Sequence, residues 1–141
     1  MNASVLTPAL ERLLDSRPIG VLATEGVSGR PSQSIVYYAR EGDRLLISSV
    51  HERQKVKDVE RNGRASLNVV GAERPFPSAT FSGRAQVLRV GIGAATAAVA
   101  QRVVGSDEPL EEQSDDALAS VGRVIIAIDV ERVAAASYLN E

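Results

Sequence analysis

The chain has 141 residues, which is long enough for one domain with one sizeable hydrophobic core. Its hydrophobic content of 44% and charged content of 24% are typical of a globular protein, and a net charge of −2 argues against a general nucleic-acid partner. The lack of cysteine excludes disulfides, thiol nucleophiles and thiolate metal sites, and a single histidine excludes a multi-histidine metal centre within one chain. We therefore expect a single domain over residues 1–141 without a metal site.

The first part of the chain predicts a helix, and the rest predicts mostly strands. Thr7 precedes Pro8 as the N-cap of a helix that continues to Pro18. Short apolar runs between turn residues then indicate strands. The expected strands cover residues 19–24, 31–39, 44–49, 65–70, 79–90 and 121–136, and further helices cover 53–62, 94–104 and 115–120. This order favours a mainly β fold with helices (α+β), arranged as a small barrel with helical inserts.

No apolar run approaches the ~20 residues that a membrane helix needs. Residues 1–14 also lack the charged start and apolar centre of a signal peptide. We therefore expect a cytoplasmic protein with neither a membrane nor a nucleic-acid partner.

The junction between the third strand and the second helix is the most informative stretch. Arg53 and Lys55 would lie in the first turn of that helix, where cations oppose the helix dipole by roughly 0.3–1 kcal/mol each. Free backbone N–H groups and two cations at one point make sense if an anion such as phosphate binds there. A solvated basic turn remains the alternative.

The strand over residues 31–39 carries polar side chains on both faces. Ser32, Ser34, Val36 and Tyr38 would share one face, and Gln33, Ile35 and Tyr37 the other. Hydroxyl and amide groups beside an anion site could hydrogen-bond a flat polar heterocycle. A half-exposed strand without a ligand explains the same pattern.

Four further signals give little support for a function. His51 could act as an acid or base, but nothing nearby forms a triad with it, which favours a surface turn residue. Ser49 and Glu52 fit a capping box. Gly91-Ile-Gly lacks the third glycine and the βαβ surroundings of a nucleotide-binding loop. The acidic stretch 106–116 fits a solvated connector.

Several motifs together resemble one family. They are Gly20-Val-Leu-Ala-Thr, Gly29-Arg-Pro with Val36-Tyr37-Tyr38, Gly42-Asp43-Arg44, Ser48-Ser49 followed by Arg53-Gln54-Lys55-Val56, and Phe81-Ser-Gly83-Arg-Ala85. The chain resembles the split β-barrel flavin and deazaflavin oxidoreductases, the pyridoxamine 5′-phosphate oxidase-like proteins, over residues 7–90 and more loosely in the last strand. Its Arg-Gln-Lys segment most resembles the branch that uses coenzyme F420.

The resemblance implies a split β-barrel like that of FMN-binding proteins, and it implies roles for individual residues. Arg53 and Lys55 match residues that grip the cofactor phosphate, with Gln54 between them, and Ser48 and Ser49 match hydroxyls beside it. Gln33, Ser34, Ile35 and Val36 match the strand along the isoalloxazine-type ring, and Tyr37 or Tyr38 would line the substrate side. No catalytic side chain is expected, because the cofactor carries the chemistry.

Departures from the family narrow the function. The second strand has no base between Arg30 and Arg40, and residues 130–141 show no match to substrate-phosphate ligands, which argues against vitamin B6 activity. The insert over residues 91–120 is longer than in the smallest members. Three functions remain: an F420-dependent reductase of small unsaturated or conjugated molecules, an FMN-binding relative that need not hold a polyglutamate tail, and a non-catalytic carrier of cofactor, haem or fatty-acyl ligands.

The last strand also bears on assembly. Residues 124–130 are apolar on both faces, as expected of a strand that is covered twice. One chain of this size would struggle to cover that strand and a cofactor groove as well. We therefore expect a homodimer, as the family resemblance implies, with the cofactor sites between the two barrels.

Overall fold

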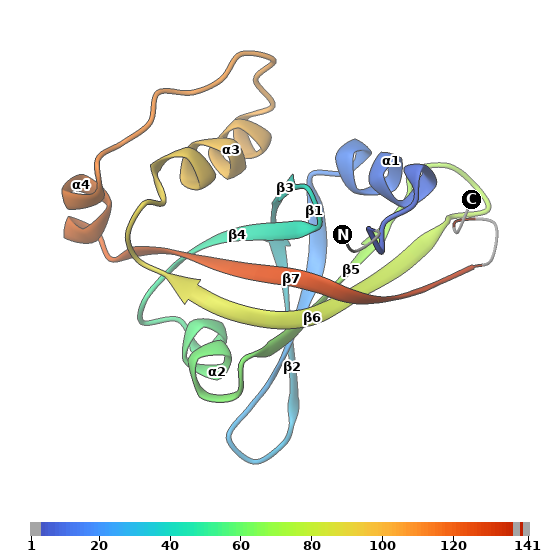
Figure 1. The fold of residues 1–141 in the computed structure, drawn as a ribbon, viewed down its shortest axis with the longest axis horizontal. Helices are drawn as coiled ribbons and strands as arrows, with labels where there is room; N and C mark the ends of the chain where they lie inside the picture. The colour runs from blue at the N-terminus through green and yellow to red at the C-terminus, as the bar shows by residue number, and fades with distance from the viewer. Residues whose placement is uncertain (1–3, 137–138, 140–141) are drawn as a thin grey trace.

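The computed structural model describes residues 4–136 and residue 139, which form a curled antiparallel sheet with four helices around it (Figure 1). The helices are α1 (Pro8–Ser16), α2 (Gln54–Asn62), α3 (Gly93–Val104) and α4 (Asp115–Ser120). The strands are β1 (Ile19–Glu25), β2 (Pro31–Tyr37), β3 (Ala39–Glu41), β4 (Arg44–Val50), β5 (Arg64–Val70), β6 (Ser78–Leu88) and β7 (Arg123–Ala135). The strand order is β2-β1-β5-β6-β7-β4-β3, a split β-barrel as predicted.

The main core lies on the inner side of the curled sheet. Alternate residues of each strand point into it, and α1 closes one end by burying Leu10, Leu13 and Leu14. The hydroxyl of Thr7 accepts a hydrogen bond from the backbone N–H of Leu10, which confirms the predicted N-cap. In the described part of the chain, no helix is long and apolar enough to cross a membrane.

A second, smaller core lies on the outer side of β4 and β7. There α3 and α4 cover the sheet (Figure 1), and the buried residues are Ala39, Leu46, Ile92, Val99, Leu118, Ile125 and Ala127. Because Val124, Ile126 and Ile128 point into the main core, β7 is covered on both faces by its own chain. The predicted double cover of β7 is correct, and because the chain itself supplies it, this strand gives no reason for a second subunit. The homodimer stays a prediction.

A β-bulge changes the direction of side chains where β6 crosses β7. The register shifts between Ser82, which faces Arg132, and Gly83, which faces Val130, so that Glu131 is the extra residue. A Cβ atom at Gly83 would lie 1.9 Å from the carbonyl oxygen of Asp129, so only glycine fits. The bulge therefore fixes which side chains of β7 reach the outer face near its end.

Three sequence predictions need correction. The strand expected over residues 31–39 ends at Tyr37, and Ala39–Glu41 form the separate short strand β3. Helix α2 begins at Gln54 with Arg53 as its N-cap, and no side chain caps it. The expected capping box is therefore wrong: Ser49 is paired with Val124 inside β4 and lies too far from the helix start.

Candidate functional site

The α3 cavity, a hollow of about 610 Å³ between the insert and the edge of the sheet, contains many of the predicted site residues. Its size is within the range of small-molecule and cofactor pockets. The lining residues are Ile35, Val36, Tyr37, Ser48, Lys55, Thr96, Val99, Ala100, Val103, Val104, Gln113, Leu118, Val121 and Arg123. The fold thus brings together β2, β4, the start of α2 and the insert, which are far apart in the sequence.

One wall of the α3 cavity is polar and cationic. Ser48 of β4 and Arg123 of β7 are diagonal neighbours on the same face of the sheet, with Arg123 Nη1 3.5 Å from Ser48 Oγ. Lys55 reaches the cavity from the first turn of α2. This wall therefore combines two cations, a hydroxyl and the N-terminal end of a helix, all of which favour an anion.

The charge of Lys55 is poorly solvated. The side chain is half-buried, and burial together with the nearby charge of Arg53 lowers the pKa of its amine. Within residues 4–136, neither Arg53, Lys55 nor Arg123 forms an ion pair with a carboxylate. A bound phosphate would stabilise this uncompensated positive charge, so the residues present fit the phosphate of a flavin or deazaflavin.

The second wall of the cavity is the edge strand β2. Ile35, which is 72% exposed, and Tyr37 project from the outer face of this strand, as the alternation of the sequence predicts. Val36 points toward the main core but also borders the cavity. An apolar strand edge beside a cationic wall is suited to a flat ring attached to a phosphate.

The third wall comes from the insert and is apolar. Val99, Val103 and Val104 of α3 face Leu118 of α4 and Val121, which follows α4. Arg102 fixes the position of α3, because its guanidinium donates hydrogen bonds to the backbone carbonyls of Leu14, Asp15 and Arg17 at the end of α1. The same group lies 5.1 Å from the centre of the Tyr38 ring.

Several predicted residues lie away from this cavity. Gln33 and Ser34 lie farther along β2, and Arg53 is exposed at the N-cap of α2, where it acts on Lys55 through charge alone. Ser49 is buried and, by the alternation of β4, points to the inner face of the sheet, opposite to Ser48.

Tyr38 and Gln54 have structural roles instead of the expected ones. Tyr38 is fully buried in the main core, and its hydroxyl donates to the carbonyl of Leu14 at 2.6 Å, so it cannot line a substrate site. The side-chain amide of Gln54 donates to Asp58 at 2.9 Å. We therefore correct the expected substrate role of Tyr38, and we assign Gln54 to the support of α2.

Two residues of this region were missed by the sequence analysis. Asp58 is a fully buried carboxylate that accepts hydrogen bonds from Gln54, Thr24 and Arg61. Burial alone would raise its pKa, but these three donors lower it overall. The spacing of Gln54 and Asp58, four residues apart in one helix, was a usable signal. Arg123 offered none, because its proximity to Ser48 depends on the pairing of β4 with β7.

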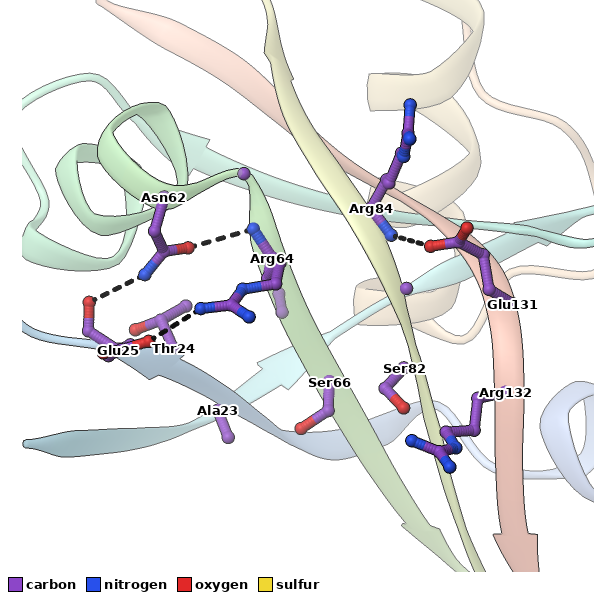
Figure 2. A pocket seen from close by; sticks show the side chains of 13 residues that line it. Ala23, Thr24, Glu25, Asn62, Arg64, Ser66, Ser82, Arg84, Glu131 and Arg132 are labelled. Atoms are coloured by element: carbon purple, nitrogen blue, oxygen red, sulfur yellow. Dashed lines mark hydrogen bonds and ion pairs between the residues drawn. The ribbon is translucent and has the colours of Figure 1, made fainter. Parts of the chain in front are cut away.

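A second, more open groove of about 740 Å³ lies on the outer face of β1, β5 and β6 (Figure 2). Of its charged side chains, Arg64 contacts Glu25 at 3.3 Å, and the Glu131 carboxylate accepts a hydrogen bond from the backbone N–H of Arg84 at 2.9 Å. Among the described residues, the guanidinium groups of Arg84 and Arg132 form no ion pair. It contains none of the predicted site residues. The α3 cavity, which contains predicted site residues and has apolar walls beside its cations, is therefore the better candidate for a cofactor.

Comparisons with known proteins agree with the fold and with a cofactor site. Residues 6–136 match the pyridoxamine 5′-phosphate oxidase family model, and the chain belongs to this family. No curated protein sequence matches the chain. A structure called an F420 reductase is 26% identical, with a TM-score of 0.69 over 88% of this chain and 94% of that one.

Two further structures show how varied the ligands of this fold are. An FAD-binding protein from Mesorhizobium loti is 21% identical, with a TM-score of 0.66 over 87% of this chain and 88% of that one. HutZ, a haem storage protein from Vibrio cholerae, is 17% identical, with a TM-score of 0.66 over 92% and 94% of the two chains. The likeness to these two establishes the fold alone.

Proposed function

We propose that this protein is an oxidoreductase that uses coenzyme F420 to reduce a small unsaturated or conjugated molecule. The observation that carries this proposal is the α3 cavity, where Lys55 and Arg123 lie beside the exposed edge of β2 without a carboxylate partner among the described residues. The Arg-Gln-Lys segment at the start of α2 and the similarity to an F420 reductase support the deazaflavin over other cofactors.

The residues of the chain would bind and orient the cofactor. Lys55, Arg123 and the hydroxyl of Ser48 would hold the phosphate, and Ile35 and Tyr37 would lie along the ring. When bound, reduced coenzyme F420 would supply the hydride, and solvent at the open side of the cavity would supply the proton that completes the two-electron reduction. The apolar wall of α3 would exclude water from the reacting groups and hold the acceptor close.

The experiment that tests this proposal is a parallel titration of the protein with F420 and with FMN, followed by fluorescence. We expect F420 to bind at least tenfold more tightly. Tighter binding of FMN would instead support an FMN-dependent oxidoreductase of the same fold. Reoxidation of added reduced F420 by menadione, followed by absorbance, then distinguishes an enzyme from a carrier that binds without turnover.

A haem carrier is the weaker alternative for this chain. Haem proteins hold the iron through histidine, cysteine, methionine or tyrosine side chains. His51, the only histidine, lies outside the α3 cavity, at the exposed turn before α2, and among the described residues Tyr37 is the one side chain of these four types that lines the cavity. A carrier of an apolar cofactor or fatty-acyl ligand is compatible with the α3 wall, and the turnover measurement above addresses it.

We also propose that the protein is a homodimer, on different grounds from those that the sequence suggested. The outer face of β1, β5 and β6 carries small side chains such as Ala23, Ser66 and Ser82, and in Figure 1 no helix lies over it. Both the open groove and a smaller hollow of about 150 Å³ lie on this face, whose rim includes the exposed Ile35 and Val70. A two-fold partner on this face would bury these residues.

A further inference from the structure

We infer that the insert half of the α3 cavity is a site for an uncharged, largely apolar acceptor that carries one hydrogen-bond-accepting group such as a ketone. This inference rests on the proposed function, because it names the class of molecule that would receive the hydride. It concerns the wall formed by α3, α4 and Val121, opposite Lys55 and Arg123.

The distribution of charge across the cavity supports this assignment. Every charged side chain that lines the cavity, Lys55 and Arg123, belongs to the sheet side. The insert contributes only apolar side chains apart from Thr96 and Gln113. A second charged group in the ligand would have no partner on the insert wall, and its desolvation would be unfavourable.

The exposure of the apolar residues points in the same direction. Val103 is 49% exposed and Val121 is 64% exposed, although both line a concave site. Water in contact with such a surface is displaced favourably by an apolar molecule. Arg102 holds this wall against the end of α1, so that the apolar surface is present before a ligand arrives.

Thr96 adds one polar contact to this wall. Its Oγ1 atom is buried and has no hydrogen-bond partner among the described residues, although the residue lines the cavity. A buried hydroxyl without a partner is unfavourable, and threonine in a helix has two accessible χ1 rotamers. Rotation about χ1 would turn the hydroxyl toward the cavity, where it could donate to a carbonyl oxygen of the acceptor.

The apolar part of the inference is tested with N-phenyl-1-naphthylamine, an uncharged probe whose fluorescence rises in apolar sites. We expect the wild-type protein to bind the probe, and Val103→Asp and Val121→Asp each to weaken binding at least tenfold, since a carboxylate would enter the apolar wall. The matched control is Val27→Asp, at a position that is 81% exposed in the turn between β1 and β2. Equal probe affinity in all four proteins would overturn the inference.

The polar contact is tested by displacing the probe with 2-acetylnaphthalene and with 2-ethylnaphthalene, which has nearly the same shape but no carbonyl. We expect the ketone to compete roughly three- to tenfold better with the wild type, from one hydrogen bond. Thr96→Val should abolish this preference, and Thr96→Ser should retain it. A preference that survives in Thr96→Val would contradict the role of Thr96.

These outcomes separate the inference from the proposed function. Titration of F420 into the wild type is measured independently of the probe. Deazaflavin binding in a protein whose probe affinity is unaffected by Val103→Asp and Val121→Asp would defeat the inference alone. Probe binding with the expected variant effects, but without deazaflavin binding, would defeat the proposed function alone.

Discussion

Arg123 Nη1 lies 3.5 Å from Ser48 Oγ, across the ladder that joins β7 to β4. The two residues are 75 positions apart in the sequence, and the guanidinium has no carboxylate partner in the described chain. The pair therefore places a positive charge and a hydroxyl together in the α3 cavity, which is also lined by Lys55 of α2.

The first prediction concerns Lys55, which we expect to contribute more to cofactor binding than any other charged side chain. A charge-assisted contact with phosphate in a partly desolvated groove contributes about 1.5–3 kcal/mol. Lys55→Ala should therefore weaken F420 binding roughly 10- to 150-fold, as measured by fluorescence quenching at fixed ionic strength. Lys57, exposed two residues farther on, is the control, and Lys57→Ala should change the affinity less than about threefold. If Lys57→Ala weakened F420 binding more than Lys55→Ala, our assignment of the cofactor-binding face of α2 would be wrong.

The second prediction concerns Arg123. Since this residue is partly exposed, we expect Arg123→Ala to weaken F420 binding by about tenfold, near the lower end of the range for charge-assisted contacts. Arg30→Ala removes a cation from the exposed turn between β1 and β2 and serves as a control. If Arg123→Ala and Arg30→Ala weaken F420 binding by the same small factor, Arg123 acts only through the overall charge of the protein.

The third prediction concerns Asp58 and the stability of the first turn of α2. Hydrogen bonds from Gln54, Thr24 and Arg61 outweigh burial and lower the pKa of this carboxyl group below its usual range. The contribution of Asp58 to stability is thus fully present above the pKa of an unfolded aspartate, about 3.9, and is lost as the pH falls through the lower pKa of the folded state.

We expect Asp58→Asn to lower the free energy of unfolding by about 2 kcal/mol at pH 7, less than for a fully buried ion pair because Arg61 is partly exposed. Urea denaturation from pH 7 to pH 3 measures this difference, which should shrink on the acid side. Asp107→Asn, in the exposed connector after α3, should change stability by less than about 0.5 kcal/mol. If the difference in the free energy of unfolding between wild type and Asp58→Asn did not change with pH, the ionisation of Asp58 would not contribute to stability.

The fourth prediction separates two adjacent tyrosines. Burial raises the pKa of the Tyr38 hydroxyl to about 12. Its contribution to stability is therefore complete below the unfolded pKa of about 10 and is lost as the pH rises toward the folded value. In a background in which Tyr37 and Tyr138, the other two tyrosines of the chain, are replaced by Phe, absorbance at 295 nm should show delayed ionisation of Tyr38.

The functional effects of the same two residues should differ. Tyr38→Phe removes the hydrogen bond to Leu14 and should lower the free energy of unfolding by about 1 kcal/mol while leaving F420 affinity unchanged. Tyr37→Phe should have the opposite pattern, because Tyr37 lines the α3 cavity and is 41% exposed. An effect of Tyr38→Phe on affinity larger than that of Tyr37→Phe would restore Tyr38 as a ligand-binding residue.

The fifth prediction concerns assembly. Light scattering at micromolar concentration should give the mass of a dimer, and Ser66→Glu, which places a charge on the outer face of β5, should shift it toward the monomer. Ala94→Glu, exposed in the first turn of α3, should leave the mass unchanged. A monomeric wild type would remove the proposed dimer.

The elements could be predicted from the sequence wherever a local pattern determines them. Thr7 and Pro8 marked the start of α1, and the alternation along residues 33–38 correctly separated inward from outward side chains. The start of α2 was placed one residue too early, at Arg53 instead of Gln54, and the capping pattern of Ser49 and Glu52 was misleading because pairing with β7 holds Ser49 in β4. Competition between local and long-range hydrogen bonds decided that boundary.

The residues of the candidate site differ in the same way: those in local patterns were predicted, and those positioned by long-range pairing were missed. Lys55 was predicted because strand and helix join close to it, and Ser48 because it matches a motif of the family; both line the α3 cavity. Arg123 and the valines of α3 were missed because only the register of β7 against β4, and the attachment of Arg102 to the end of α1, bring them there. Neither relationship has a periodic signature in a single sequence.

The two-sided burial of β7 also bears on how the protein is made. This strand pairs with both β4 and β6 and contributes to the inner and the outer core, yet it covers only residues 123–135. During synthesis, neither core can therefore be completed before this strand emerges from the ribosome. The hairpins that emerge earlier would have exposed apolar surfaces until then. Emergence of β7 from the ribosome is then the step after which the chain becomes resistant to proteolysis, and the amides of β7 should be among the slowest to exchange in the finished protein.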